Sequence, residues 1–563
     1  MRRYAFSYTI RDCRGPSGLA MTFRAAFLRN MSVLALLFIM QIFFPAAAEA
    51  GAETSPGGQG VLTAESAEVA EGKIKTKISA LSPATARRSA ETSAASAVKN
   101  SVLKGGCAKV NITPPLGIPL IGSYGKPSDD VLDELYAKAL VLNDGSTTLA
   151  IVSVDLLYVP LEEITNPVRS IIKEKIGIPD QNVLICATHT HSGPEVFTRL
   201  KVPREGRVPA SQIDQSYLAT LIKKIASSVL IAYKNMQDDS RKAGSQVKIG
   251  AARGEIPEIV YNRRAKTKDG SVKMAFTLPD EVTTRRRATE YTEGTEKTKK
   301  SSEVSVLSVA KSRIEPELVF GPIDPEVWVL RVEDANGESV GSIVNFACHP
   351  VCIYPYLSTT ISADYPAYAT QVVEQTEGGT CLFALGTAGN IVPMKRGLKP
   401  CQQIGKALGA EALRRLQLVS TSGDVTLKAI RKEIKLPTKK APSEDKTAKN
   451  SKTTGLPLRL PTQGGAAGYV NTEIQVLKLG DIYILGLPGE ILVEVGLAIK
   501  RKAGVEKLFV VSLSNDAIGY VCHDQAYDEG GYEPGSGTNL AKGSGEIMIK
   551  EALDLISQIK PSP

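Results

Sequence analysis

The sequence predicts a layered α/β domain built on mixed sheets. Short apolar runs typical of buried strands alternate along the chain with stretches whose apolar residues recur at helical spacing. Strands that alternate with helices are typical of layered α/β domains. Hydrophobic residues make up 43% and charged residues 23% of the 563 residues, which is enough apolar sequence for a sizeable core.

The expected elements follow from these runs in chain order. Ordered sequence begins near Cys107, where a strand is expected to run into Thr113-Pro114-Pro115. Further strands are expected at residues 149–157, 183–187, 327–332, 342–348, 381–385, 482–487 and 508–513. Helices are expected at residues 167–175, 217–233, 367–375, 402–416 and 491–502. Residues 266–314 and 439–461 are charged and lack apolar periodicity, so we expect two loop insertions there.

Residues 1–50 have the pattern of a targeting segment. Arg24 and Arg29 precede an apolar run at residues 33–44, which ends in Ala48-Glu49-Ala50. This pattern predicts a secretory signal peptide, and hence a periplasmic or secreted protein. The residues before Met21 add nothing to this pattern, so Met21 and Met31 are candidate start residues besides Met1. The alternative to a cleaved signal peptide is an uncleaved membrane tether. Residues 51–104 are rich in small polar residues and predict a linker, which leaves residues 105–560 as the folded domain.

Charge and cysteine content limit the partners and the kinds of metal site. The formal charge is +9, but the basic clusters lie in polar stretches with acids nearby, and no nucleic-acid motif accompanies them. We therefore expect no nucleic-acid partner. Seven cysteines would remain after the signal segment, so at least one stays free or pairs between chains. The absence of a C-x-x-C pair makes a thiolate zinc site unexpected.

Five residues that can bind metals follow predicted strands. His189 and His191 come directly after residues 183–187, and His349 ends residues 342–348. Glu490 and Tyr520 follow the strands expected at 482–487 and 508–513. An open α/β sheet gathers its site at the carboxyl ends of its strands. Each residue alone fits a structural role, but three strand-end histidines out of four in the sequence favour a metal site.

Several short motifs in a fixed order resemble the neutral/alkaline (non-lysosomal) ceramidase family. The most specific motif is Thr188-His189-Thr190-His191-Ser192-Gly193-Pro194. The resemblance runs from about Cys107 to Ala552, and the further matching segments are Asn111 to Pro115, Asn262-Arg263, Ala347 to Pro350, Ser362 to Pro366, Pro488 to Glu490, Gly519 to Val521, Tyr527, and Tyr532-Glu533.

The resemblance implies a zinc site, an activity and a set of catalytic residues. It implies that Zn²⁺ is bound by His189, His349, Glu490 and Tyr520. It also implies that His191, Arg263 and Tyr532 support the reaction, which in this family is hydrolysis of the N-acyl bond of ceramide. Zinc accepts imidazole and carboxylate ligands and lowers the pKa of a bound water to about 7. The expected activity is therefore amide hydrolysis by zinc-activated water, and either Glu490 or His191 transfers the proton.

Two departures from the family pattern leave alternatives open. Where the family has an acid and a serine, this sequence has Asn390 and Val392, so we expect no acyl-enzyme at that position. The family also has a carboxyl-terminal immunoglobulin-like domain of about 100 residues, and the sequence after Tyr532 is too short for one. The substrate is then a lipid or another small acyl compound, and membrane-surface contact is left open. The alternatives are a zinc hydrolase of another amide or ester, and a metal-containing binding protein without turnover.

Overall fold

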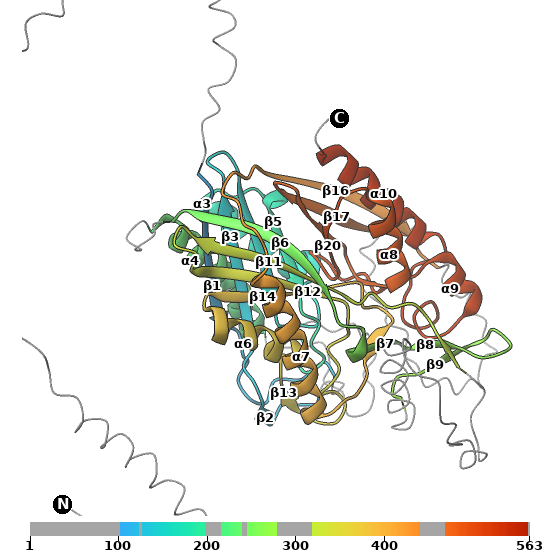
Figure 1. The fold of residues 1–563 in the computed structure, drawn as a ribbon. Coiled ribbons are helices and arrows are strands. Elements are labelled where there is room, and N and C mark those ends of the chain that lie inside the picture. The colour runs from blue at the N-terminus through green and yellow to red at the C-terminus, as the bar shows by residue number, and fades with distance from the viewer. Residues whose placement is uncertain are drawn as a thin grey trace, which may run out of the picture. The chain divides into compact units, whose positions relative to one another are not determined.

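The fold is a layered arrangement of three four-stranded sheets with helices on their outer faces (Figure 1). The computed structural model describes residues 102–122, 126–196, 215–238, 245–278, 318–439 and 468–560. The predicted signal peptide, nearly all of the predicted linker and most of both expected insertions lie outside these residues. All described residues belong to the compact unit that begins at Val98.

The first sheet has the strand order β1-β3-β4-β5. Its strands are β1 (Lys104–Asn111), β3 (Tyr136–Asn143), β4 (Thr148–Val154) and β5 (Val183–Ala187). Only β4 and β5 are parallel. The outer face is covered by α3 (Asn166–Ile176) and α4 (Gln215–Gln237), whose apolar stripes pack towards it.

The second sheet has the order β14-β12-β11-β6. Its strands are β6 (Val247–Glu255), β11 (Glu326–Asp334), β12 (Ser339–Phe346) and β14 (Thr380–Leu385). Here β12 and β14 are the parallel pair. Its outer face is covered by α6 (Tyr365–Glu377) and α7 (Leu398–Leu416), which also pack against each other (Figure 1).

The third sheet has the order β16-β17-β18-β20 and lies towards the carboxyl terminus. Its strands are β16 (Leu427–Pro437), β17 (Tyr469–Leu479), β18 (Ile482–Gly486) and β20 (Lys507–Val511), with β18 and β20 parallel. The helices on its outer face are α8 (Val493–Lys502) and α10 (Ser544–Ile559). Figure 1 shows both helices in red on the side of the molecule away from α6 and α7.

A central apolar core joins the inner faces of all three sheets. Side chains alternate along each strand, so that in β3 Leu140 and Leu142 enter this core while Ala139 and Val141 face the helices. Trp328 of β11 and Phe509 of β20 meet in the same core with their ring centroids 5.4 Å apart. Because the three sheets share one core, their strand ends are held rigidly relative to one another.

Short elements complete the fold around the strand ends. They are β2 (Asp130–Val131), β7 (Val260–Asn262), β8 (Arg264–Lys266), β9 (Val272–Met274), β10 (Val319–Phe320), β13 (Thr360–Ile361), β15 (Ile391–Pro393), β19 (Glu490–Ile491), β21 (Tyr520–Val521) and α9 (Asp524–Glu529), with short helical turns at Leu161–Thr165, Asp180–Asn182 and Pro257–Ile259. The β8–β9 hairpin occupies the start of the insertion expected at 266–314, so the ordered chain extends further into it than predicted.

The predicted α/β architecture is confirmed, with differences in detail. Every expected strand and helix has a counterpart in the described residues. The helix expected at 491–502 begins only at Val493, because Glu490 and Ile491 pair with Tyr520 and Val521 as a short parallel bridge. Glu490 is therefore a strand residue and not part of the first turn of a helix.

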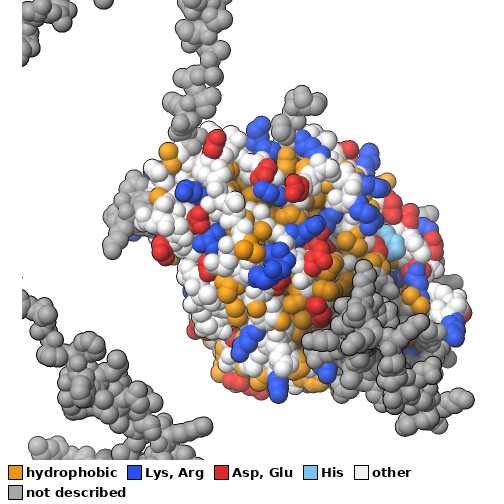
Figure 2. Space-filling model, in the orientation of Figure 1, with side chains coloured by type: hydrophobic (Ala, Val, Ile, Leu, Met, Phe, Trp, Pro, Cys, Tyr) orange, Lys and Arg blue, Asp and Glu red, His pale blue; other side chains and the backbone are white. Residues whose placement is uncertain are grey.

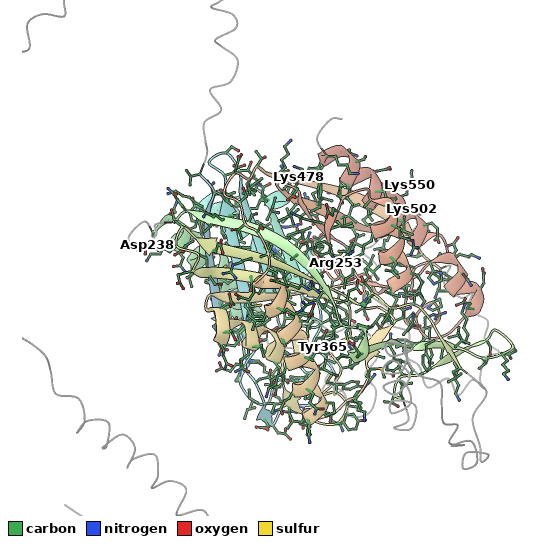
Figure 3. The ribbon with its side chains drawn as sticks, viewed as in Figure 1. Asp238, Arg253, Tyr365, Lys478, Lys502 and Lys550 are labelled. Carbon is green, nitrogen blue, oxygen red and sulfur yellow. The ribbon has the colours of Figure 1, made fainter. Side chains whose placement is uncertain are left out.

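The surface of the described part mixes charges of both signs. Figure 2 shows Lys and Arg side chains interspersed with Asp and Glu across the visible face. Arg253 of β6, labelled in Figure 3, is an example: it pairs with Glu326 at 2.7 Å and lies over the ring of Trp328. None of the helices in the described ranges combines the length and the apolar character that a bilayer crossing requires.

Candidate metal centre

The carboxyl ends of the three parallel strand pairs lead into one buried site. His189 follows β5, His349 follows β12, and Glu490 and Tyr520 follow β18 and β20. Backbone hydrogen bonds join these strand ends: Ala187 N–H donates to Leu513 O, and Gly389 N–H donates to Ile491 O. Four residues that are far apart in the sequence are therefore brought together by the common core.

Each of the two ligand histidines predicted from the sequence has one ring nitrogen engaged by the backbone. His189 Nδ1 lies 2.9 Å from Leu157 O, and His349 Nδ1 contacts Ala388 O. A carbonyl can only accept, so each Nδ1 carries a proton and each Nε2 faces the site. This is the arrangement by which proteins orient metal-binding histidines. His189 also has φ 71°, so the chain leaves the extended conformation of β5 at this residue.

Three potential ligand atoms from distant segments converge at this point. Glu490 Oε2 lies 3.3 Å from His189 Nε2 and 3.3 Å from His349 Nε2. His189 Nε2 is buried and has no hydrogen-bond partner among the described residues. Two ligands bonded at about 2.0–2.1 Å to one tetrahedral zinc ion lie about 3.3 Å apart. The spacing of this donor set therefore fits a zinc ion, as its chemistry does.

The protonation states agree with a metal site. Burial, aided by the positive charge of Arg263, lowers the pKa of His349 to about 4, so its imidazole is neutral near pH 7. Burial raises the pKa of Glu490, but His189 and His349 outweigh it and hold that pKa well below the usual range. A neutral imidazole beside an ionised carboxylate is the state in which both bind metal.

Tyr520 lies at the same site, beside a buried arginine. Arg263 Nη2 donates to Tyr520 Oη at 3.2 Å and to Gly389 O at 2.8 Å. Burial and the negative charge of Glu490 raise the pKa of Tyr520 well above its usual value, while Arg263 opposes this shift. Even with Arg263 beside it, the phenol therefore stays protonated near pH 7 unless a metal ion is bound. Tyr532 packs on Tyr520 with ring centroids 5.6 Å apart and lies within 5.8 Å of the Arg263 guanidinium.

His191 lies beside the other two histidines, with its ring centroid 4.9 Å from that of His189 and 5.8 Å from that of His349. Each of the three histidines, His189, His191 and His349, has one ring nitrogen that lies within 4.8 Å of a ring nitrogen of the other two. Burial and its two histidine neighbours lower the pKa of His191 well below the usual value, and His191 Nε2 has no partner among the described residues. The family resemblance implies that His191 supports the reaction and is not a zinc ligand. Its position in the structure is compatible with either role.

Asn390 and Val392, where the sequence departs from the family pattern, have structural contacts. Asn390 Oδ1 accepts from Val493 N–H at 2.9 Å, and Asn390 Nδ2 donates to Glu494 at 2.9 Å. The amide therefore caps the start of α8. Val392 is fully buried in an apolar cluster with Tyr261 and Val351. Neither side chain can act as a nucleophile.

Two residues with roles at the site were missed from the sequence. Tyr158 Oη donates to Glu490 Oε1 at 2.9 Å, so it orients the carboxylate. Glu533 is fully buried and bridges Arg263 at 2.7 Å and Arg264 at 2.9 Å. Tyr158 lies just past β4, so the strand-end rule that pointed to the histidines could have found it. Nothing in the sequence pairs Glu533 with two consecutive arginines.

Comparison with known proteins identifies the architecture. No family model matches the chain. The structure is similar to the crystal structure of neutral ceramidase from Pseudomonas aeruginosa, with a TM-score of 0.58 and 18% sequence identity. That match covers 82% of this chain and 75% of the other. The chain has the neutral ceramidase fold.

A second solved structure gives the same result. It is described as a ceramidase complexed with C2, and it matches with a TM-score of 0.57, 18% identity, 82% of this chain and 77% of its own. These likenesses confirm the predicted fold class and the predicted resemblance to a neutral ceramidase-type domain. At this level of identity the shared feature is the fold, so the metal and the chemistry depend on the residues of this chain.

Proposed function

We propose that this protein is an exported zinc-dependent hydrolase that cleaves an N-acyl amide bond. The observation that carries the proposal is the convergence of three potential ligand atoms, with Glu490 Oε2 lying 3.3 Å from both His189 Nε2 and His349 Nε2. Its fold neighbours are ceramidases, one of them complexed with C2, which supports an acyl substrate of lipid type. Export rests on the signal-peptide pattern of residues 1–50.

Zinc would be held by His189, His349, Glu490 and Tyr520, and when bound it supplies an activated water and positive charge at the carbonyl. Arg263 is held by Glu533 and faces Tyr520, so it is placed to donate to the oxygen that becomes negative during attack. His191 and Tyr532 are the other donors proposed for this oxygen. Tyr158 keeps Glu490 in place while the proton moves.

The reaction balances with water alone as co-reactant. The water oxygen bonds to the acyl carbon, the C–N bond breaks, and one water proton passes to the leaving amine through Glu490 or His191. The products are a carboxylic acid and an amine. Because Val392 replaces the serine of the family pattern, we propose direct attack by water without an acyl-enzyme. The alternative nucleophiles are the hydroxyls of Thr387 and Ser192, of which Ser192 adjoins His191; its N–H donates to Thr190 Oγ1 at 3.2 Å in a turn.

The test is metal analysis combined with a substrate panel. Purified protein should contain about one zinc per chain, and it should hydrolyse N-acyl amides faster than matched esters. A chelator should abolish hydrolysis, and added zinc should restore it. Zinc-free protein with full activity would refute the metal role, whereas a zinc protein that hydrolyses only esters would refute the amide assignment. A covalent acyl adduct on Ser192 would refute direct attack. Amino-terminal sequencing of the exported protein, expected to begin near Gly51, tests the location.

A further inference from the structure

Arg396 lies beside the candidate metal centre, in the short loop between β15 and α7. The two sides of this loop are tied to the His349 segment: His349 N–H donates to Ile391 O at 2.9 Å, and Gly397 N–H donates to Cys352 O at 2.7 Å. Met394 N–H, two residues before Arg396, donates to Ile259 O at 2.9 Å, which ties the loop to the segment that leads into Arg263. The position of Arg396 is therefore fixed by the same backbone that presents His349.

Arg396 differs from the other arginines of the described chain in having no acid partner. Arg263 and Arg264 share Glu533, and Arg169 pairs with Glu473 at 2.8 Å. Within the described ranges, every arginine except Arg396 and the exposed Arg501 forms an ion pair with a carboxylate, the further pairs being Arg253–Glu326, Arg331–Glu333, Arg331–Glu377, Arg414–Glu411, Arg415–Glu411 and Arg431–Glu473.

The missing partner is costly because Arg396 is partly buried. Its Nε atom is buried and has no hydrogen-bond partner among the described residues. An unsatisfied buried donor of this kind destabilises the folded state, and the cost is larger when the group is charged. Burial and the nearby positive charge of Arg263 lower the pKa of Arg396, and no carboxylate offsets them. A protein keeps such a group where a ligand supplies the missing anion.

The side chains next to Arg396 are apolar and aromatic. Tyr261, Val351 and Val392 form a buried cluster, and Met394, two residues before Arg396, packs on its edge. Tyr261 and Tyr356 are among the groups that interact electrostatically with Arg396. The cluster itself is buried, but Tyr356 is largely exposed, so an unpaired guanidinium near this ring suits a ligand that carries both an apolar chain and an anionic group.

We propose that Arg396 binds an anionic group of the substrate, so that the preferred substrates are acidic N-acyl amides and not neutral ones. The guanidinium fork matches the oxygens of a carboxylate or a phosphate, which are the two sources of this chemistry. The inference rests on the proposed amide hydrolysis, and it specifies the class of substrate. It also explains why Arg396 is the one partly buried arginine among the described residues that has no carboxylate partner.

The experiment compares matched substrates that differ only in charge. N-dodecanoyl-glycine is compared with N-dodecanoyl-glycinamide, and N-dodecanoyl-phosphoethanolamine with N-dodecanoyl-ethanolamine. The wild-type enzyme should show a kcat/KM about 10- to 100-fold higher for the acidic member of at least one pair, the range expected for a charge-assisted hydrogen bond. The pair with the larger ratio identifies carboxylate or phosphate as the source.

The decisive readout is the acidic-to-neutral ratio in variants. Arg396→Met should bring this ratio close to one, and Arg396→Lys should restore part of it as a point charge. Arg501→Met is the matched control, because Arg501 is exposed on α8 and unpaired in the described structure, and it should keep the wild-type ratio. A wild-type ratio near one, or an unchanged ratio in Arg396→Met, overturns the proposal while amide hydrolysis stands.

A binding measurement separates this inference from the proposed function. Calorimetric titration of the wild-type and Arg396→Met proteins with N-dodecanoyl-glycine, after metal removal by a chelator, reports binding without turnover. Tight binding that depends on Arg396, in a protein that hydrolyses no amide when zinc is present, would support the anion site and refute the amidase. Equal binding by both proteins would count against the anion site whatever the activity.

Discussion

Two buried groups of possible metal ligands in the described structure look alike by distance but differ in chemistry. His189, His191 and His349 form one group, and Cys352, Asp364 and Cys401 form the other, each with its donor atoms within 4.8 Å of one another. In the first group the backbone engages one nitrogen of His189 and of His349 and leaves the other nitrogen free to bind a ligand.

In the second group the hydrogen bonds are already made. Asp364 accepts from Ile353 N–H at 2.8 Å and from Tyr365 N–H at 2.7 Å, and Cys401 Sγ contacts its Oδ1 at 3.8 Å. Burial raises the pKa of Cys352 to about 11, so its thiol stays protonated. Asp364 caps α6, whose first residue Tyr365 is labelled in Figure 3. Donor atoms that remain unsatisfied, more than donor atoms that lie close together, indicate a metal site.

The largest expected effect separates the two groups by metal content. His349→Ala removes a ligand whose Nε2 has no other role, so this variant should lose its zinc and all measurable hydrolysis while it stays folded. Cys401→Ala, at a position equally buried in the second group, should keep about one zinc per chain. Metal analysis of both proteins, with circular dichroism to check folding, makes the comparison. Full zinc occupancy in His349→Ala would mean that the ligand assignment is wrong.

A large kinetic effect is expected for Arg263. Arg263→Ala should reduce kcat by about 10²–10³ with a smaller change in KM, because an oxyanion donor acts mainly in the transition state. Arg264→Ala is the matched control, since Arg264 pairs with the same Glu533 but forms no contact with Tyr520 in the described structure. Steady-state kinetics should show a much smaller loss of kcat in the control. Equal losses would indicate that Glu533 organises structure and not catalysis.

A smaller effect is expected for Tyr158. Tyr158→Phe removes the hydroxyl that donates to Glu490 Oε1 and leaves the ring in place. Loss of such an outer contact to a metal ligand typically costs about 10- to 100-fold in metal affinity or activity. Competition with a zinc chelator of known affinity measures the change. Unchanged affinity and unchanged turnover would show that Glu490 does not depend on Tyr158 for its orientation.

Changes to the second group should affect stability alone. Cys401→Ala removes a contact to the buried Asp364 carboxylate and leaves a small void, which together should cost about 1–3 kcal/mol in the free energy of unfolding. Cys401→Ser keeps a hydrogen-bond donor and should cost less. Urea denaturation of the two variants gives the values. A fall in zinc content in either variant would instead make this group a second metal site.

The smallest effect concerns pH and Asp133, which neighbours the second group. Asp133 accepts from Ser362 Oγ and from Ala363 N–H, both at 2.6 Å, but burial raises its pKa from 3.8 to about 7. A carboxyl whose folded pKa is raised binds its proton more tightly in the folded state, so its contribution to stability falls as pH rises from about 4 to about 7. Asp133→Asn should remove this part of the pH dependence. Urea midpoints at pH 4.5 and 7.5 should therefore differ less in the variant than in the wild type.

Much of the fold could be predicted from the sequence, because short apolar strands such as β5 and β14 have a strong local signal. Four long strands were not predicted. β3 was missed although its run YAKALVLN is largely apolar, and β17 was missed as well. The other two carry weaker signals. β16 alternates apolar residues with lysine and arginine, and β6 contains two glycines, so neither shows the apolar run by which the other strands were found. α10 was missed although it is amphipathic. The meeting of three sheets in one core could not be predicted, because it depends on contacts between distant segments.

The candidate site was predictable where residue type and motif order carried the signal. All seven predicted residues lie in one region, with His189, His349 and Glu490 in mutual contact. The pairings that hold them were not predictable, although the position of Tyr158 at a strand end was. Tyr158 lies 332 residues from Glu490, and Glu533 lies 270 residues from Arg263. Such pairs are determined by the packing of strand ends and leave no local pattern in the sequence.

The bridge between β19 and β21 constrains how this protein can evolve. It is two residues long on each side, and it pairs Glu490 with Tyr520 in register. Glu490 N–H donates to Gly519 O at 2.9 Å and Leu492 N–H to Val521 O at 3.1 Å, which fixes that register from both ends. Because neighbouring strand residues point to opposite sides, a one-residue insertion or deletion within the bridge would turn a predicted ligand away from its partner. Point substitutions around the bridge can therefore be tolerated during evolution, whereas an insertion or deletion of one residue within it would disrupt the site.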